Sequence, residues 1–185
     1  IHVAGTNGKG STVNFMRELL MEAGVRVGAF TSPHLQKMNE RLTIDGIDIS
    51  DELLIAYVND VATVIEREQL EPNFFEIMTV LAWRYFAEQN VEIALIEVGI
   101  GGRIDSTNVA TPLVSVITSI GFDHTDLLGN TLQSITHEKA GVIKPYVPVV
   151  TAVTQKEANE LIAHIAAEQR APHYAYDEQF TFVEE

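Results

Sequence analysis

A glycine-rich stretch near the start of the chain carries the residues best suited to bind phosphate. Its glycines let the backbone turn tightly and point N–H groups at phosphate oxygens. Lys9 can reach the β- and γ-phosphates, and a hydroxyl group at the start of the following helix can bind Mg²⁺. The stretch is therefore predicted to bind ATP through Thr6, Asn7, Gly8, Lys9, Gly10, Ser11 and Thr12.

The match to the general phosphate-loop pattern, G-x-x-x-x-G-K-[ST], is imperfect. Val3 stands where the first glycine is expected, and Gly10 follows Lys9 where Ser or Thr is usual. The hydroxyl comes one residue later, at Ser11. A glycine-rich turn without a ligand is the alternative, but a strand, a loop, a lysine and a hydroxyl in this order favour phosphate binding.

Other residues that could do chemistry follow other predicted strands. Glu97 lies near the end of an apolar run, and a buried carboxylate is unfavourable unless it is paired or bound to a metal. It either forms an ion pair with Lys9 or Arg103 or binds Mg²⁺. Ser32 and His124 also follow strands, although on residue type alone they are typical of a loop serine and a hydrogen-bonded structural histidine.

Lys139 lies on a predicted helix, 131–143, where helical spacing puts it on one face with Leu132, Ile135 and Ile143. That apolar face is expected to point at the sheet. A lysine there should be neutralised, paired or modified. The alternative is that its side chain extends to the edge of the helix.

Short β-branched runs alternate with segments of helical period, which predicts an α/β fold. The first helix should turn Val13, Met16, Leu19, Leu20 and Ala23 inward. We expect a mostly parallel sheet with helices on both faces, and ligands at the carboxyl ends of its strands. The expected strands are 1–4, 25–30, 93–98, 114–120, 148–152 and 173–176, with a hairpin at 42–49 that turns at Asp45-Gly46. The expected helices are 11–23, 51–69 with Ser50 as its N-cap, 74–88, 131–143 and 157–169.

Composition excludes several classes of protein. Hydrophobic residues make up 46% of the 185 residues, which is typical of a globular chain. A net charge of −14 disfavours nucleic acid as a partner. No apolar run is long enough to span a membrane, and the absence of cysteine excludes disulfides and thiolate metal sites. We expect a cytoplasmic protein and, because both ends lie in strand-like sequence, a fragment truncated at both ends.

Several short motifs, taken together, resemble the Mur ligase superfamily, and within it the branch of folylpolyglutamate synthases and dihydrofolate synthases. Each motif is short, but the set follows the order of that branch and covers nearly the whole chain. The motifs are Gly5–Ser11 with its variant spacing, Thr31–Leu35, Asn39–Arg41, Phe74–Glu76, Glu97–Asn108, Asp123-His124 and His137–Gly141.

This resemblance implies an ATP-dependent amide ligase. ATP would phosphorylate a carboxylate of dihydropteroate or folate, and the amino group of L-glutamate would then displace phosphate from the acyl phosphate. Residues 1–185 would form a single ATP-binding domain of the Mur ligase central type, working as a monomer. The smaller C-terminal domain that helps to bind ATP and glutamate in such enzymes would be absent from this chain.

The resemblance also assigns residues to the site. Two magnesium sites would use Ser11, Ser32, Glu97, His124 and a carbamylated Lys139. The catalytic residues would be Lys9, Lys139, Asp105 and His124. The substrate would contact Pro33, His34, Arg41, Phe74, Phe75, Glu76, Ile104 and Asn108.

Simpler interpretations exist for several of these residues. Asp105 and Asn108 could serve turn chemistry, and Arg41 could be a solvated loop residue. The aromatic residues Phe74 and Phe75 could belong to the core or to a helix N-terminus.

Three other functions are weaker. A peptidoglycan-precursor ligase fits neither the variant loop nor Phe74-Phe75-Glu76. A nucleotide switch would explain Asp123-His124, but the chain lacks the guanine-reading Asn-Lys-x-Asp. A nucleotide-binding module without turnover remains compatible with a fragment.

Overall fold

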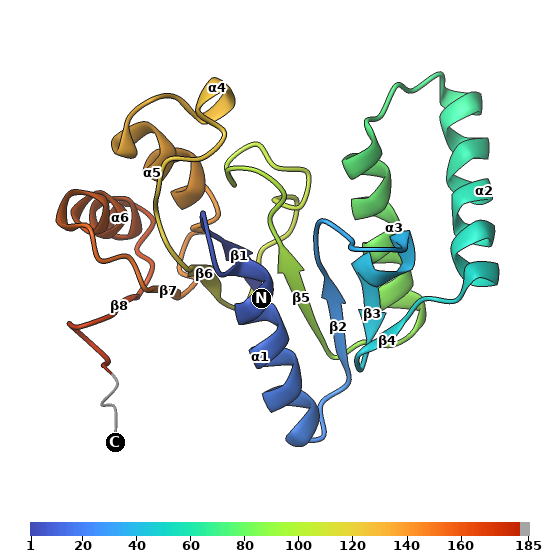
Figure 1. Ribbon diagram of the computed structural model, residues 1–185, viewed down its shortest axis with the longest axis horizontal. Helices are drawn as coiled ribbons and strands as arrows, with labels where there is room; N and C mark the ends of the chain where they lie inside the picture. The colour runs from blue at the N-terminus through green and yellow to red at the C-terminus, as the bar shows by residue number, and fades with distance from the viewer. Residues whose placement is uncertain (182–185) are drawn as a thin grey trace. The chain divides into compact units, whose positions relative to one another are not determined.

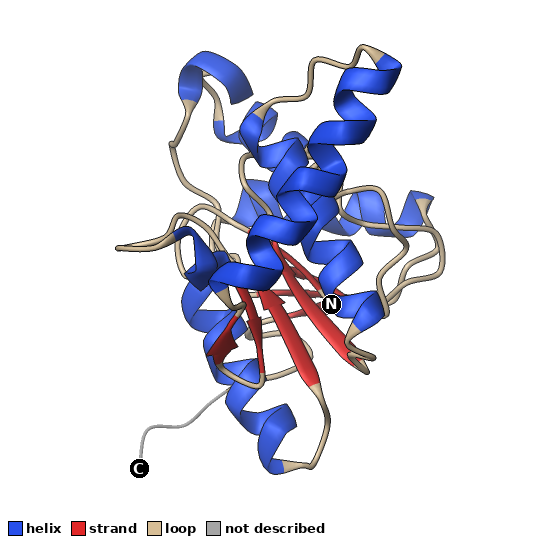
Figure 2. Ribbon diagram, turned by 90° about the vertical axis from the view of Figure 1, so that its right-hand side faces the viewer, coloured by secondary structure: helices blue, strands red, loops and turns tan. Residues whose placement is uncertain are grey.

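The computed structural model describes residues 1–181, which form two compact units. The first unit contains residues 1–12 and the chain from residue 98 onward, and the second contains residues 13–97. Figure 1 labels the helices and strands, and Figure 2 separates them by colour. Each unit is described by itself.

Parallel strands form the sheet of the first unit. They are β1 (His2–Ala4), β6 (Ser115–Ile117), β7 (Val149–Thr151) and β8 (His173–Ala175), in the order β1-β6-β7-β8. The register aligns His2 with Ser115, Ser115 with Val149, and Val149 with His173. The carboxyl ends of these strands therefore lie along the same edge.

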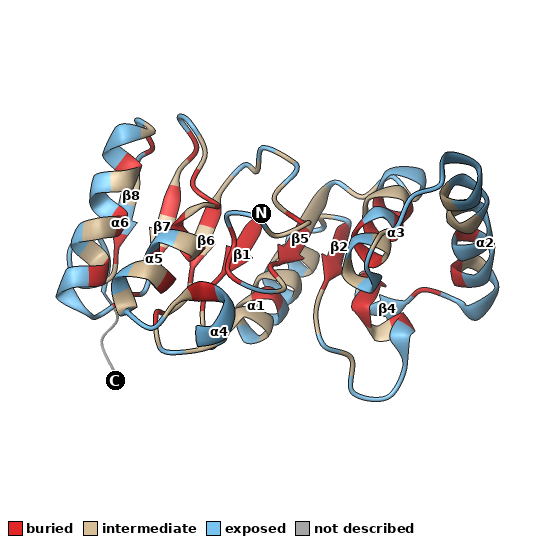
Figure 3. Ribbon diagram, turned by 90° about the horizontal axis from the view of Figure 1, so that it is seen from above, coloured by how far each residue is buried: buried red, intermediate tan, exposed pale blue. Residues whose placement is uncertain are grey.

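Helices α4 (Thr125–Leu128), α5 (Leu132–Ala140) and α6 (Lys156–Glu168) belong to the same unit. Ile135 of α5 and Ile162 of α6 are fully buried in one apolar cluster with Ile117 and Val149 of the strands. The outer side of α6 is exposed (Figure 3), as expected for a helix with one apolar face.

The sheet of the second unit is mixed. It contains β2 (Val27–Phe30), β3 (Leu42–Ile44), β4 (Ile47–Asp48) and β5 (Ile93–Glu97), in the order β4-β3-β2-β5. β2 pairs in parallel with β5 and antiparallel with β3. The β3–β4 hairpin turns at Asp45 and Gly46, whose φ angles are 50° and 76°, as its Asp-Gly sequence predicts.

Helix α3 (Phe74–Glu88) packs on this sheet and α2 (Asp51–Glu68) packs against α3. A short 3-10 helix, η1 (Met38–Arg41), precedes β3. Leu54 and Tyr57 of α2 and Leu81 of α3 join one buried cluster with Phe30 and Leu42. The hydroxyl of Ser50 accepts a hydrogen bond from the backbone of Leu53 at 3.2 Å, which confirms the predicted N-cap of α2.

Helix α1 (Lys9–Glu22) begins in the first unit and continues in the second. The expectation that Leu19 and Ala23 point inward is wrong, because Leu19 is 73% exposed and Ala23 is exposed as well. Phe15, one turn before Leu19, is 71% exposed, so Phe15 and Leu19 form an apolar strip on the outer side of the helix.

The predicted α/β class with mostly parallel strand pairing is confirmed. The differences are local. Helix α5 ends at Ala140, before Gly141, rather than at Ile143, and neither η1 nor α4 was expected. Strand-like sequence was expected at the C-terminus, where residues 182–185 lie outside the described part of the chain. Within residues 1–181, no helix combines the length and apolar character needed to cross a membrane.

Candidate active site

The predicted phosphate loop connects β1 to α1 in the first unit. Gly5 and Gly8 have φ angles of 146° and 85°, which residues with a side chain rarely adopt. The amide of Thr12 donates to the carbonyl of Gly8 at 2.9 Å and closes the first turn of the helix. The first residues of α1 thus present backbone N–H groups that the helix itself leaves unsatisfied.

Residues that follow β6 hold this loop in place, a role that their residue types alone do not predict. The amide of Asn7 donates to Ser119 Oγ at 2.9 Å, and Thr118 Oγ1 donates to the Asn7 carbonyl at 2.7 Å. Thr6 Oγ1 exchanges hydrogen bonds with the backbone of Gly121 at 3.0 and 3.1 Å. Hydrogen bonds within the chain therefore hold the loop in this shape.

Two lysines meet at one carbonyl oxygen of the loop. Lys9 Nζ donates to the Gly5 oxygen at 3.0 Å, and Lys139 Nζ donates to the same oxygen at 3.1 Å. Lys139 is only 2% exposed, so the predicted inward orientation is confirmed and the alternative of extension to the helix edge is wrong. Burial, and then the charge of Lys9, lower the pKa of Lys139 to about 8, while Asp123 opposes the shift.

The loop after β5 uses Asp105 to order its own backbone. One carboxylate oxygen accepts hydrogen bonds from the amide and hydroxyl of Thr107, and the other accepts from the amide of Ile100 at 3.0 Å. His2 Nε2 lies 2.8 Å from the same hydroxyl. Asp105 therefore has the turn role that its residue type suggested.

Asn108 fastens this loop to α5. Its amide nitrogen donates to the carbonyls of Arg103 and Gly141, both at 3.0 Å, and Arg103 pairs with Glu138 at 2.8 Å. Ile104 between them is 81% exposed. The predicted substrate residues Ile104 and Asn108 thus lie on a loop attached to the helix that carries Lys139.

His124 occupies a strained position in the same unit. Its φ angle is 46°, its side chain is 45% exposed, and its Nε2 lies 3.6 Å from Asp123 Oδ1. The imidazole is therefore accessible to a ligand.

Glu97 and Ser32 meet in the second unit because they lie at the carboxyl ends of neighbouring parallel strands. Phe30 of β2 aligns with Ile96 of β5, and two residues further on the Ser32 amide donates to Glu97 Oε2 at 3.1 Å. Glu97 is 4% exposed. The strand-end position predicted for this carboxylate is confirmed.

Arg41 is a buried part of a cluster with His34 and Phe74. Its side chain is 8% exposed, so the alternative of a solvated loop arginine is wrong. Nε donates to His34 Nδ1 at 2.8 Å, and the guanidinium carbon lies 5.3 Å from the centroid of the Phe74 ring. Burial lowers the pKa of Arg41, and the charge of Glu97 opposes this.

The motif Phe74-Phe75-Glu76 divides into different roles. Phe75 stacks on Phe30 at 5.5 Å in the core, and the Glu76 carboxylate accepts from the Asn73 amide at 2.8 Å as part of a capping box. Phe74 is 48% exposed and presents the most open aromatic ring of the motif.

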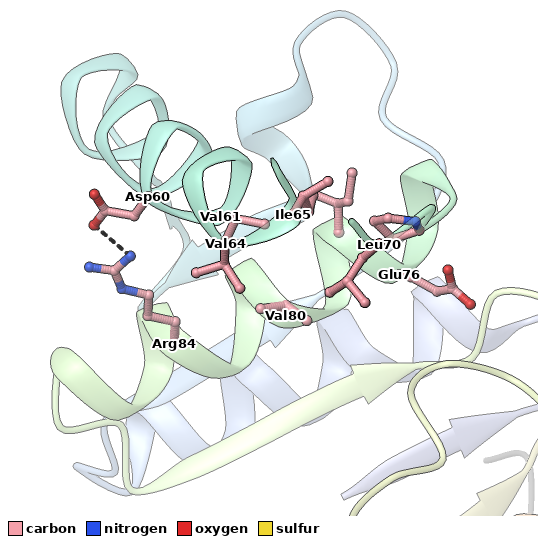
Figure 4. A pocket seen from close by; sticks show the side chains of 10 residues that line it. Asp60, Val61, Val64, Ile65, Leu70, Glu76, Val80 and Arg84 are labelled. Carbon is pink, nitrogen blue, oxygen red and sulfur yellow. Dashed lines mark ion pairs between the residues drawn. The ribbon is translucent and has the colours of Figure 1, made fainter. Parts of the chain in front are cut away.

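Helices α2 and α3 also enclose an apolar groove of about 280 Å³ (Figure 4). At one end the Arg84 guanidinium and the Asp60 carboxylate pair with each other at 2.8 Å. Since these charged groups are already paired, the groove lacks the converging polar groups that orient a small ligand. Val61, Val64, Ile65, Leu70, Ile77 and Val80 line it.

Metal binding by acidic and histidine side chains alone has no support in the described residues. Across residues 1–181, no group of at least three His, Cys, Asp or Glu side chains could hold a metal ion. The predicted ligand set differs in kind, because it includes serine hydroxyls and a modified lysine.

Comparison with known proteins finds a matching family description and several similar proteins. The family description "Mur ligase middle domain" matches residues 3–181. A dihydrofolate synthase/folylpolyglutamate synthase of Bacillus subtilis is 54% identical over 176 residues, which cover 92% of this chain and 41% of that protein. A folylpolyglutamate synthase of Lacticaseibacillus casei is 42% identical over 186 residues, covering 98% of this chain and 44% of that protein.

A solved structure described as an FPGS–AMPPCP–folate complex superposes with a TM-score of 0.96 at 41% identity, covering 99% of this chain and 46% of that one. The chain thus spans less than half the length of these relatives. The branch predicted from short motifs is the branch of its relatives, so the resemblance is confirmed.

Proposed function

Because this chain belongs to the Mur ligase family, we propose that it is the ATP-binding part of an amide ligase that adds L-glutamate to dihydropteroate or to folates. The substrate carboxylate would take the γ-phosphoryl group of ATP, and the glutamate amine would then displace phosphate and form the amide. The observation that carries the proposal is the loop Gly5–Thr12, braced by hydrogen bonds within the chain, with Lys9 and Lys139 at one of its carbonyls. The names of the two relatives point to the same reaction.

Residues Thr6 to Thr12 would hold the triphosphate. The net charge of the chain is −14, so its overall field does not attract an anion and binding must rely on local groups. The N-terminus of α1 and the ammonium group of Lys9 supply them. Lys9 would exchange the Gly5 carbonyl for phosphate oxygens, which are stronger partners.

We propose Ser11, Ser32, Glu97, His124 and Lys139 as magnesium ligands at two sites. Bound Mg²⁺ would neutralise charge on the phosphoryl group that is transferred. The buried carboxylate of Glu97 is the kind of oxygen ligand that Mg²⁺ prefers. The lowered pKa of Lys139, about 8, supplies the neutral amine that must attack CO₂ to form a carbamate, with loss of one proton.

Arg41, His34 and Phe74 would take part in substrate binding, together with Pro33. Arg41 is a cation with little contact with water, and the exposed ring of Phe74 beside it could stack on a flat heterocycle. Phe75 and Glu76 would act on the substrate through the position of Phe74. Ile104, Asn108 and Asp105 would contribute from the loop attached to α5.

We further propose that the chain forms one domain of a longer monomeric enzyme of the cytoplasm, with no nucleic acid or membrane partner. The greater length of its relatives supports the longer protein. The acidic composition supports the absence of nucleic acid.

The decisive experiment is an assay of ATP-dependent glutamate addition to dihydropteroate and to folates by the full-length protein. Release of ADP should require the pteroate or folate substrate, and an indifferent rate would overturn the proposal. Lys9→Ala should lower kcat/KM by about 100-fold or more. Lys156→Ala, which removes a lysine that is 88% exposed on α6, is the control and should leave the rate unchanged.

A further inference from the structure

The segment between β2 and β3 leaves the sheet and returns to it at neighbouring points. Phe30 aligns with Leu42 across the antiparallel pair, and the Thr31 amide donates to the Arg41 carbonyl at 3.1 Å. Residues 32–40 therefore form a closed loop, called the β2–β3 loop below. It carries Ser32, Pro33 and His34, three of the residues assigned to the site.

The carboxylate of Glu40 accepts hydrogen bonds from the tip of this loop, residues 35–37. Glu40 Oε2 accepts a hydrogen bond from the Leu35 amide at 2.7 Å, and Oε1 accepts from the amides of Gln36 at 2.9 Å and Lys37 at 2.7 Å. Successive N–H groups that converge in this way form an anion-binding nest, and hydrogen bonds to an ionised acceptor are strong. These amides also hold the pKa of Glu40 below its usual value.

The residues on either side of Glu40 are fixed by other parts of the unit. The Asn39 side chain is buried and donates to the Ile49 carbonyl and to Asp51, both at 2.8 Å. Arg41 is also buried and donates to His34. The backbone of Glu40 is therefore held firmly, and its carboxylate transmits that position to the loop tip.

Side-chain packing cannot hold the tip itself, because Leu35, Gln36 and Lys37 are all exposed, Leu35 by 93%. The order of the tip then depends on the three hydrogen bonds to Glu40. His34 lies directly before the first of these residues. If the tip lost its order, His34 would keep its hydrogen bond with Arg41 but lose the support of the backbone that follows it.

We propose that Glu40 is a positioning residue for the ligase reaction, which fixes residues 35–37 and thereby holds Pro33 and His34 in place for the substrate. The effect of Glu40 on catalysis rests on the proposed function, whereas its hydrogen bonds to the loop tip do not depend on it. Glu40 does not contact the reacting atoms in this scheme, because both of its oxygens are occupied by backbone amides.

The first test measures the loop directly, by amide hydrogen exchange in the full-length protein. Glu40→Gln replaces one acceptor oxygen by an NH₂ group, which faces a backbone donor and repels it. Exchange at Leu35, Gln36 and Lys37 should accelerate by about tenfold or more. Glu66→Gln, which makes the same charge change at an exposed position of α2, should leave it unchanged.

The second test separates positioning from general stability. Glu40→Gln should raise KM for the pteroate or folate substrate or lower kcat, together by about tenfold or more in kcat/KM. Nucleotide affinity should change by less than about twofold, because the phosphate loop is untouched, whereas a general loss of folded protein would lower nucleotide binding as well. Glu40→Asp, whose carboxylate is one methylene short, serves if Glu40→Gln does not fold, and should change both readouts in the same direction.

Each outcome decides one step. Unchanged exchange at residues 35–37 would show that Glu40 does not order the tip. Faster exchange with unchanged kcat/KM would overturn the positioning role while leaving the geometry intact. If the unsubstituted protein adds no glutamate to any pteroate or folate, the proposed function fails, and the exchange experiment still reports on Glu40.

Discussion

At the scale of single residues, Gly5 is the position in the phosphate loop where an added side chain would come closest to another atom. A Cβ atom at this position would lie 1.9 Å from Thr118 Oγ1, and its φ angle of 146° is one that only glycine adopts readily. The carbonyl of the same residue accepts from Lys9 and Lys139. The site therefore depends on the absence of a side chain as much as on the lysines.

Gly5→Ala should lower the unfolding free energy by about 3 kcal/mol, the sum of backbone strain and a clash that Thr118 cannot easily relieve. Gly24→Ala is a matched control, because Gly24 has a φ angle of 80° but nothing within 4 Å of an added Cβ. It should lose only about 1 kcal/mol. Urea denaturation of both variants measures the difference, and equal losses would mean that the Thr118 contact is unimportant.

The hydrogen bonds around buried His2 determine which of its ring nitrogens carries the proton. Thr107 has one hydroxyl proton, which it donates to Asp105, so His2 Nε2 must donate to the Thr107 oxygen. Because the pKa of His2 is lowered to about 4, the imidazole is neutral near pH 7, and its one proton lies on Nε2. Burial lowers the pKa of His2 to about 4, although the charge of Asp105 opposes this.

This lowered pKa makes stability depend on pH. Between pH 6.5 and about 4 the unfolded chain binds a proton at His2 that the folded chain does not, so stability falls as the pH falls through this window. From pH 7.5 to pH 5 the loss due to His2 should be about 2 kcal/mol. Denaturation of His2→Gln should show a correspondingly flatter pH profile. His164→Gln, at a side chain that is 70% exposed, should keep the steep one.

At the scale of elements, the capping of α3 separates two roles of Glu76. The Asn73 side chain accepts from the amides of Phe75 and Glu76, and Glu76 accepts from the Asn73 amide in return. Glutamine serves as well as glutamate in such a capping box. The cap, rather than the charge, is therefore expected to determine stability.

Glu76→Gln should keep the unfolding free energy within about 0.5 kcal/mol, whereas Asn73→Ala should lose about 1 kcal/mol. Thermal or urea unfolding checks both. A large loss for Glu76→Gln would show that its negative charge has a stabilising partner besides the Asn73 amide.

The elements were predictable from sequence where periodicity or capping specifies them. Ser50 marked the start of α2, Asp45-Gly46 marked the hairpin, and the spacing of Lys139 with Ile135 placed it inward. The bracing of the phosphate loop by Thr118 and Ser119 was not predictable, because it joins residues more than one hundred positions apart. The exposure of Leu19 was missed because an apolar pattern shows which residues could be covered and does not show what covers them.

The residues of the candidate site were likewise predictable only in part. Strand-end residues such as Glu97 and Ser32 were predictable because parallel strands deliver their carboxyl ends to one edge. The role of Glu40 was not, because three backbone amides leave no trace in residue types. Sequence therefore predicted which residues carry charge at the site better than which residues hold them.

At the scale of the whole chain, charge is unbalanced, with 26 acidic and 12 basic residues. Mutual repulsion among like charges destabilises a compact state, and salt screens it over about 10 Å at 0.1 M. Salt also weakens ion pairs, but within residues 1–181 many of these pairs are exposed, such as Arg67–Glu68 at 66% and 53%, and exposed pairs contribute little. Repulsion should therefore dominate the response to salt.

We expect that raising NaCl from 20 to 200 mM at pH 7 increases Tm of a protein made of these 185 residues, by about 2 to 5 °C. The sequence pI of about 4.7 provides the control, since near that pH the net charge vanishes and the same addition of salt should leave Tm nearly unchanged. Calorimetry at the two pH values makes the comparison. A fall in Tm with salt at pH 7 would mean that attractive ion pairs outweigh the repulsion among the excess negative charges. The electrostatic repulsion of ATP by the chain would then be weaker than the composition indicates.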